Sequence, residues 1–164
     1  MKAMNRAADW FLKAVMGSSS LILFVVTFLQ VVFRFAFKAP LAWSQDIIRL
    51  CFTYLVFLGA AYCVRENAHL NIDVLLTSLK VKYQRILQIT IQVILLAFFV
   101  FLIYYGVLFA MSGAKQTAPY LPLPMSLYYM SVPLSAAFMF FYMIQQLVAL
   151  IQNFSAPEQK EDAQ

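Results

Sequence analysis

Four long apolar stretches dominate the sequence, and they lie at residues 14–34, 44–64, 86–112 and 126–151. Each is about 20 residues long or longer, which is the length that an α-helix needs to cross the hydrocarbon core of a bilayer. Of the 164 residues, 63% are hydrophobic and only 12% are charged. A chain this short cannot bury so much apolar surface in a core of its own, so the surplus must face lipid. The sequence therefore predicts an all-α integral membrane protein with four transmembrane helices.

These helices form one expected membrane domain, residues 1–154, and we expect the polar tail, residues 155–164, to be disordered. Pro133 lies in the first turns of the fourth span and is expected to kink it.

Two segments outside the spans leave alternatives open. The first thirteen residues carry apolar side chains at helical spacing, which fits either a helix lying at the membrane interface or an extension of the first span. The mixed segment 67–85 fits an amphipathic interfacial segment or a loop.

The distribution of Lys and Arg predicts the orientation. With four spans, both termini lie on one side, which carries three basic residues in the N-terminal segment, four in residues 65–85 and one in the tail. The other side carries four, namely Arg34, Lys38, Arg49 and Lys115. The positive-inside rule then places both termini in the cytoplasm.

The basic residues flank apolar runs and form no cluster of their own. The net charge of +5 therefore indicates a lipid bilayer, and not a nucleic acid, as the partner of the chain.

Several kinds of chemistry have no residues to support them. The single histidine, His69, excludes bis-histidine haem ligation within the chain and leaves no credible Ser/His/acid set. His69 and Asp73 are four residues apart, which favours a local side-chain pair over a metal site. Cys51 and Cys63 are too far apart along one helix to bond, and we interpret them as packing residues. We expect no catalytic residues, no metal and no cofactor, so the protein is not expected to be an enzyme.

Every charged residue lies at the end of a span, whereas ion-coupled carriers usually hold a charge or a broken helix near mid-bilayer. The polar residues inside the spans include Gln88, Gln92, Gln145 and Gln146. They favour hydrogen bonds between helices, and a polar solute path is the alternative. Small residues at Gly59, Gly106, Ala110 and Gly113 favour close helix contact, within the chain or with a partner.

Trp43, Asp46 and Arg49 recur at three-residue steps near one face of the second span. One interpretation is an interfacial Trp anchor beside a local Asp46–Arg49 ion pair. The other is a contact with a partner subunit.

At this point the sequence resembles a known family. The segments that carry the resemblance are Trp43-Ser-Gln-Asp46-Ile-Ile-Arg49, Phe57-Leu-Gly59-Ala-Ala61, Arg65-Glu-Asn-Ala-His69-Leu-Asn-Ile-Asp73, Thr117-Ala-Pro119, Leu121-Pro122, Tyr128 and Pro133-Leu134. Their order and spacing across four spans look like the small membrane subunit, Q-type or DctQ-like, of tripartite ATP-independent periplasmic (TRAP) transporters. The similar positions run from about Trp10 to Leu147. The family usually carries Glu where this chain has Gln45 or Asp46, so the carboxylate here is on a shorter side chain.

The resemblance implies a function in the inner membrane of a bacterial cell. There a periplasmic substrate-binding protein delivers an organic acid, such as a C4-dicarboxylate or sialic acid, and the large M-type membrane subunit moves it inward with sodium. The small subunit would act as a scaffold for the large one. The residues expected at subunit interfaces or in structural roles are Trp43, Asp46, Arg49, Gly59, His69, Asp73, Pro119, Pro122 and Pro133. Two other functions remain as alternatives to the TRAP subunit, namely a stand-alone four-helix carrier and a membrane anchor of a redox complex.

Overall fold

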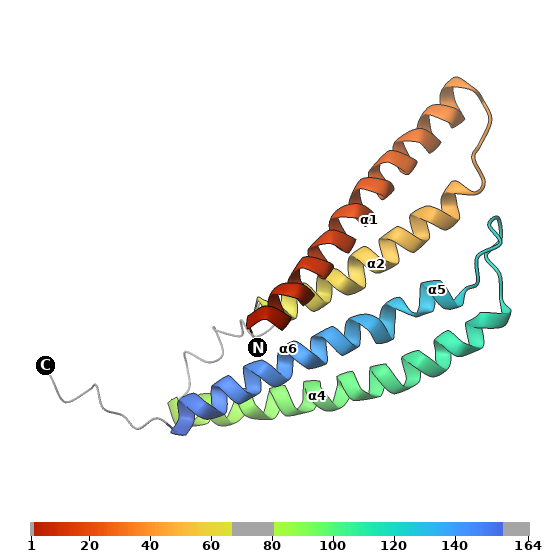
Figure 1. Ribbon diagram of the computed structural model, residues 1–164. Coiled ribbons are helices and arrows are strands. Elements are labelled where there is room, and N and C mark those ends of the chain that lie inside the picture. Colours follow the sequence, from red (N-terminus) through yellow and green to blue (C-terminus); the bar gives the residue numbers. More distant parts are fainter. Residues whose placement is uncertain (1, 67–80, 156–164) are drawn as a thin grey trace, which may run out of the picture.

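The computed structural model describes residues 2–66 and 81–155, and these residues are helical apart from two links (Figure 1). The helices are α1 (Lys2–Ala36), α2 (Ser44–Arg65), α4 (Val81–Ser112), α5 (Ser126–Tyr129) and α6 (Ser131–Ser155), with a short 3₁₀ turn, η1 (Gly113–Lys115), after α4. Within the described residues, β-type pairing is confined to one isolated bridge between Thr117 and Pro124.

Four helical segments are long and apolar enough to cross a membrane, and they are Asn5–Ala36, Ser44–Arg65, Ile86–Lys115 and Ser126–Leu150. The all-α fold with four spans is therefore confirmed, and the expected boundaries agree to within a few residues except at the first helix. There the N-terminal segment continues α1 without a break, so the extension of the first span is the correct alternative. Residues 81–85 of the mixed segment begin α4, and its remainder, with His69 and Asp73, lies outside the described residues, as does most of the tail.

The helices form two hairpins, α1 with α2 and α4 with α5 and α6 (Figure 1). α2 packs on α6, so the order across the molecule is α1, α2, α6, α4. The core lies where the hairpins meet, and its largest fully buried apolar side chains are Leu12, Leu58 and Met143. α1 leans away from α6 toward its C-terminal end, and the second half of α1 leaves its apolar side chains largely exposed. The chain thus forms an open row of helices, and much of its apolar surface faces outward.

Close contact with the start of the fourth span explains the glycines Gly106, in α4, and Gly113, in η1. A Cβ atom added to Gly106 would lie 3.1 Å from Cδ of Pro133, and one added to Gly113 would lie 2.5 Å from the ring of Tyr129. Pro133 has no N–H to give to the carbonyl of Tyr129, and the fourth span is interrupted nearby, between Tyr129 and Ser131. Gly106 in α4 and Gly113 in η1 therefore serve packing within the chain, against this interrupted segment.

Gly113→Ala should destabilise the protein, because the added methyl group overlaps the Tyr129 ring and also meets the backbone nitrogen of Ser126 at 3.2 Å. Overpacking of this kind typically costs about 1–3 kcal/mol. Gly17→Ala is the matched control, since nothing lies within 4 Å of a Cβ at that position. Thermal unfolding in detergent should show a lower midpoint for Gly113→Ala alone. Equal midpoints for the two variants would contradict the close contact.

Candidate functional site

Asp46 is the most deeply buried charged side chain in the described part of the chain, with 2% of its surface exposed. It lies in the first turn of α2, where the helix dipole favours a negative charge. Its Oδ2 atom accepts hydrogen bonds from the backbone N–H groups of Tyr120 and Leu121, both at 2.9 Å. The Tyr128 hydroxyl donates to the Asp46 backbone carbonyl at 3.1 Å. One residue of α2 thus holds both the 116–125 link and the start of the last span.

The link itself is a small hairpin whose prolines prevent helix formation. The N–H of Ala118 donates to the carbonyl of Leu123, and the N–H of Met125 donates to that of Gln116, both at 2.8 Å. The N–H groups of Tyr120 and Leu121, at the tip, point instead to the carboxylate of Asp46. The hairpin is therefore fixed at its base by its own backbone and at its tip by α2. It leaves the Tyr120 side chain 60% exposed.

Trp43, Asp46 and Arg49, which were expected near one face of the second span, do not share one environment. Trp43 and Arg49 are exposed, whereas Asp46 turns inward. Within the described residues, the ion pairs are those of Arg65 with Asp9 and Glu66, so the local Asp46–Arg49 pair was a wrong alternative. The physical reason is that Asp46 turns inward, where its Oδ2 atom accepts two backbone N–H groups, whereas Arg49 is exposed.

The other predicted site residues are dispersed. Pro119 and Pro122 flank the two residues that bind Asp46, and Pro133 packs on Gly106. Gly59 faces α1, where a Cβ would meet the Met16 methyl group at 3.8 Å. These residues shape the contacts between elements, and within the described residues they do not converge on a single cavity.

A second polar cluster, which the sequence analysis missed, lies at the opposite end of the helices. Arg65 binds Asp9 at 2.5 Å, and the Tyr142 hydroxyl donates to the same Asp9 oxygen at 3.0 Å. The side-chain amides of Asn5 and Gln145 donate to each other, at 2.6 and 2.9 Å. We call Asn5, Asp9, Arg65, Tyr142 and Gln145 the inner clasp. It joins the first turns of α1 to the ends of α2 and α6.

The predicted interhelical hydrogen bonds of the glutamines are confirmed in part. Gln145 bonds to α1, and Gln146 donates to the Val64 carbonyl of α2 at 2.6 Å. Gln92 is buried, but its Oε1 atom has no hydrogen-bond partner among the described residues. The spacing of Asn5 and Asp9, four residues apart on one helix face, was the available signal for the inner clasp.

The two polar sites therefore fasten helices together. Among the described residues, no three His, Cys, Asp or Glu side chains are placed to hold a metal ion. A pocket of about 370 Å³ lies against the inner clasp, lined by Asn5, Arg65, Glu66, Tyr142, Gln145, Gln146 and Ala149. The buried carboxylate of Asp46 and the partly buried carboxylate of Asp9 each accept hydrogen bonds from other elements of the chain and so stabilise the arrangement of the helices.

These features define a multi-pass membrane protein whose polar side chains join its own helices and links. Residues 23–153 match the family described as tripartite ATP-independent periplasmic transporters, DctQ component. The chain belongs to this family and is a component of a TRAP transporter in the inner membrane, not an enzyme. The resemblance seen in the sequence is thereby confirmed.

Relatives support the assignment. The chain is 30% identical to the C4-dicarboxylate TRAP transporter small permease protein DctQ of Rhodobacter capsulatus, over 64% of this chain and 47% of that protein. It is 25% identical to the sialic acid TRAP transporter small permease protein SiaQ of Vibrio cholerae, over 75% of this chain and 71% of that protein. It is also 24% identical to the isethionate TRAP transporter permease protein DctMQ of Oleidesulfovibrio alaskensis. That match covers 84% of this chain but only 23% of the longer relative.

Replacement of Asp46 should loosen the 116–125 link. Asp46→Ala leaves the N–H groups of Tyr120 and Leu121 without their acceptor, at a cost of about 1–3 kcal/mol for each group that stays buried. We expect a lower unfolding midpoint and faster amide hydrogen exchange at these two residues. Arg49→Ala is the control, because Arg49 is exposed and one turn away. Unchanged exchange at Tyr120 and Leu121 in Asp46→Ala would contradict the role of the carboxylate.

Proposed function

We propose that this chain is the small permease subunit that holds the large M-type subunit of a TRAP transporter in place during sodium-coupled uptake of an organic acid. The observation that carries the proposal is the combination of family membership with the use of the polar groups. The buried and partly buried polar side chains at both ends join elements of the chain, and no charged residue of the described spans lies near their middle. A chain of this kind suits a scaffold better than a solute path.

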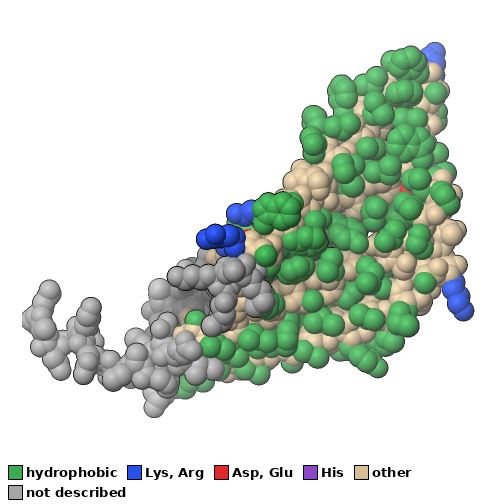
Figure 2. All heavy atoms as spheres, in the orientation of Figure 1, with side chains coloured by type: hydrophobic (Ala, Val, Ile, Leu, Met, Phe, Trp, Pro, Cys, Tyr) green, Lys and Arg blue, Asp and Glu red, His purple; other side chains and the backbone are tan. Residues whose placement is uncertain are grey.

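The open row of helices supports an assembly role. Of the 18-residue apolar windows of the four spans, only 6%, 22%, 11% and 33% are buried within the chain. Figure 2 shows apolar side chains over most of the visible face, with Lys and Arg at the ends of the molecule. Such a surface can be covered by lipid and by helices of a larger membrane subunit. The DctMQ relative, in which the similar segment is part of a much longer permease chain, favours that partner.

The substrate belongs to the other subunits in this proposal. Relatives are named for C4-dicarboxylate, sialic acid, isethionate and ectoine. Small subunits of similar sequence therefore accompany different substrates, which is expected if the substrate site lies elsewhere. We propose an organic acid, such as a C4-dicarboxylate or sialic acid.

The exposed end of the proline-rich hairpin is the proposed place for the periplasmic binding protein. Asp46 fixes the hairpin, and Tyr120 is presented on its surface. A rigid loop loses little conformational freedom on binding, which favours docking of a soluble partner. This role requires the 116–125 link to face the periplasm, and hence both termini to lie in the cytoplasm.

Co-expression with the large subunit tests the scaffold role. We expect the full chain to co-purify with that subunit in mild detergent, and Asp46→Ala and Arg49→Ala to lower recovery of the complex more than membrane insertion. Lys38→Ala, another exposed basic residue near the same end of the helices, is the matched control. Failure of the unmodified chain to co-purify with the large subunit would refute the proposal. Solute flux into liposomes that hold this chain alone would instead favour the stand-alone carrier.

Reporter fusions test the orientation. A reporter that is active only in the periplasm should be inactive when fused after Gln164 and active when inserted in the 116–125 link. The basic residues at the two ends give the reason, since eight of the twelve lie on the side of the termini. The reverse pattern of activity would place the hairpin in the cytoplasm and exclude its contact with a periplasmic protein.

A further inference from the structure

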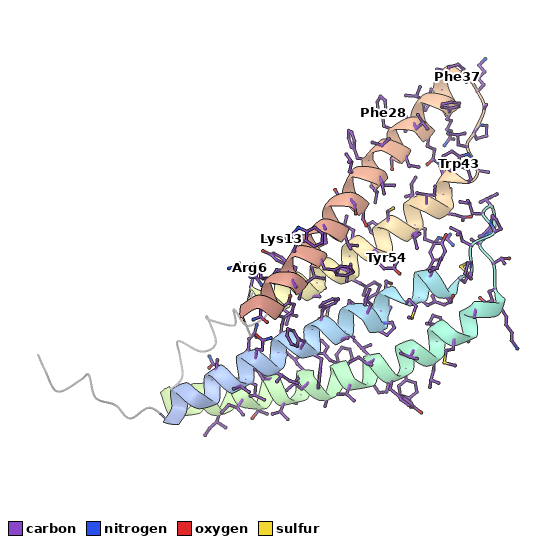
Figure 3. The ribbon with its side chains drawn as sticks, in the orientation of Figure 1. Arg6, Lys13, Phe28, Phe37, Trp43 and Tyr54 are labelled. Carbon is purple, nitrogen blue, oxygen red and sulfur yellow. The ribbon has the colours of Figure 1, made fainter. Side chains whose placement is uncertain are left out.

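One side of the first turns of α1 carries exposed basic and aromatic side chains, and Lys13, over the Tyr62 ring of α2, has a described contact with another helix. Asn5, Asp9 and Leu12 point toward the neighbouring helices. Arg6, Trp10 and Lys13, at the spacing i, i+4 and i+7, share another face of the helix and are all exposed, Trp10 to 73%. We call these three residues the basic stripe. Figure 3 shows Arg6 and Lys13 following each other along α1.

The length of α1 places the basic stripe at the depth of lipid headgroups. Lys13 and Arg34 are 21 residues apart, which corresponds to about 31 Å along an α-helix. That distance matches the hydrocarbon thickness of about 30 Å, so the two residues mark the two edges of the apolar layer. Arg6 lies about 10 Å farther out than Lys13. The basic stripe therefore crosses the headgroup layer on the side of the N-terminus.

The same helix face continues into the hydrocarbon layer. At Gly17 nothing lies within 4 Å of a Cβ position, so the surface of α1 is open next to Lys13. Farther along, Phe24, Phe28 and Phe35 fall on the same face and are 70%, 62% and 76% exposed. A molecule lying along this face would meet two positive charges and an indole first, and after Ser20 a track of exposed phenylalanine side chains.

Neither basic side chain of the stripe is neutralised by a described carboxylate. The ion pairs in the described residues involve Arg65, not Arg6 or Lys13. The Lys13 ammonium lies 5.5 Å from the centre of the Tyr62 ring, a contact that orients the side chain and leaves its charge in place. Among residues 2–66 and 81–155, no carboxylate pairs with the two charges of this face, and an anionic occupant would complement them.

We propose that the basic stripe binds the headgroup of an anionic phospholipid, with the acyl chains lying over Gly17 and along the phenylalanine track. The phosphate oxygens would accept hydrogen bonds from Arg6 and Lys13, and the indole of Trp10 suits the boundary between headgroup and hydrocarbon. The charge, the depth and the apolar continuation match one class of molecule, a diacyl lipid with net negative charge. The inference does not depend on the proposed transport role, since it concerns the isolated chain as well as a complex.

The two tryptophans of the chain, Trp10 and Trp43, allow a direct test. In a Trp43→Phe background, all tryptophan fluorescence comes from Trp10. The full chain is placed in vesicles of equal amounts of phosphatidylglycerol and phosphatidylcholine, with bromine on the acyl chains of one lipid or the other. We expect brominated phosphatidylglycerol to quench Trp10 about twofold or more strongly than brominated phosphatidylcholine, because each basic residue near the surface favours anionic lipid by about fivefold.

Charge-neutral variants complete the test. Arg6→Gln with Lys13→Gln should remove the preference, and Arg34→Gln with Lys38→Gln, the matched pair at the other end of α1, should keep it. Equal quenching by the two lipids in the parent chain would overturn the proposal, as would a preference that survives Arg6→Gln with Lys13→Gln. The measurement is repeated on the complex with the large subunit. Loss of quenching by both lipids there would show that protein covers the stripe and would likewise overturn the proposal.

Discussion

Within the hydrocarbon layer of a bilayer, a polar group finds no water, and it must be satisfied by the protein itself. In this chain that constraint concentrates the strong polar contacts at the two ends of the helices. Asp46 accepts two backbone N–H groups at one end, and Asp9 binds Arg65 and Tyr142 at the other. Between the ends, contact depends on apolar side chains and on small residues that let backbones approach.

The two ends constrain different pairs of elements. The inner clasp joins α1 to α2 and α6, whereas Asp46 joins α2 to the link that leads from α4 to α6. α2 takes part in both, so it is the element on which the row of helices depends. A change at either end of α2 should therefore alter the relation between the two hairpins, even though the middle of the helix is unchanged. In contrast, the second half of α1 contacts little besides α2 and is free to meet lipid or another protein.

The sequence predicted the parts of the fold that depend on local properties. Length and hydropathy define the four spans, whereas Pro133, which was expected to kink the fourth span, lies inside α6, three residues after the interruption at Met130. The partners of polar side chains could not be obtained in this way, because they are remote in the chain. Asp46 binds backbone groups 74 and 75 residues away, which carry no distinguishing side chain, and the nearby Arg49 suggested an ion pair that does not form. Asn5 and Gln145 are separated by 140 residues, and only the hydrogen bonds between their side-chain amides in the folded chain show that they pair.

The open row of helices also bears on how a small subunit can act on a much larger partner. A closed four-helix bundle would present convex surfaces all round, whereas a row of helices held at both ends by polar contacts presents broad apolar faces. If anionic lipid occupies the basic stripe of α1, that side of the row is committed to the bilayer, and the large subunit must approach another face. The lipid contact and the protein contact then exclude each other on α1. The charge pattern of a single helix would in this way determine which side of the scaffold remains available for assembly.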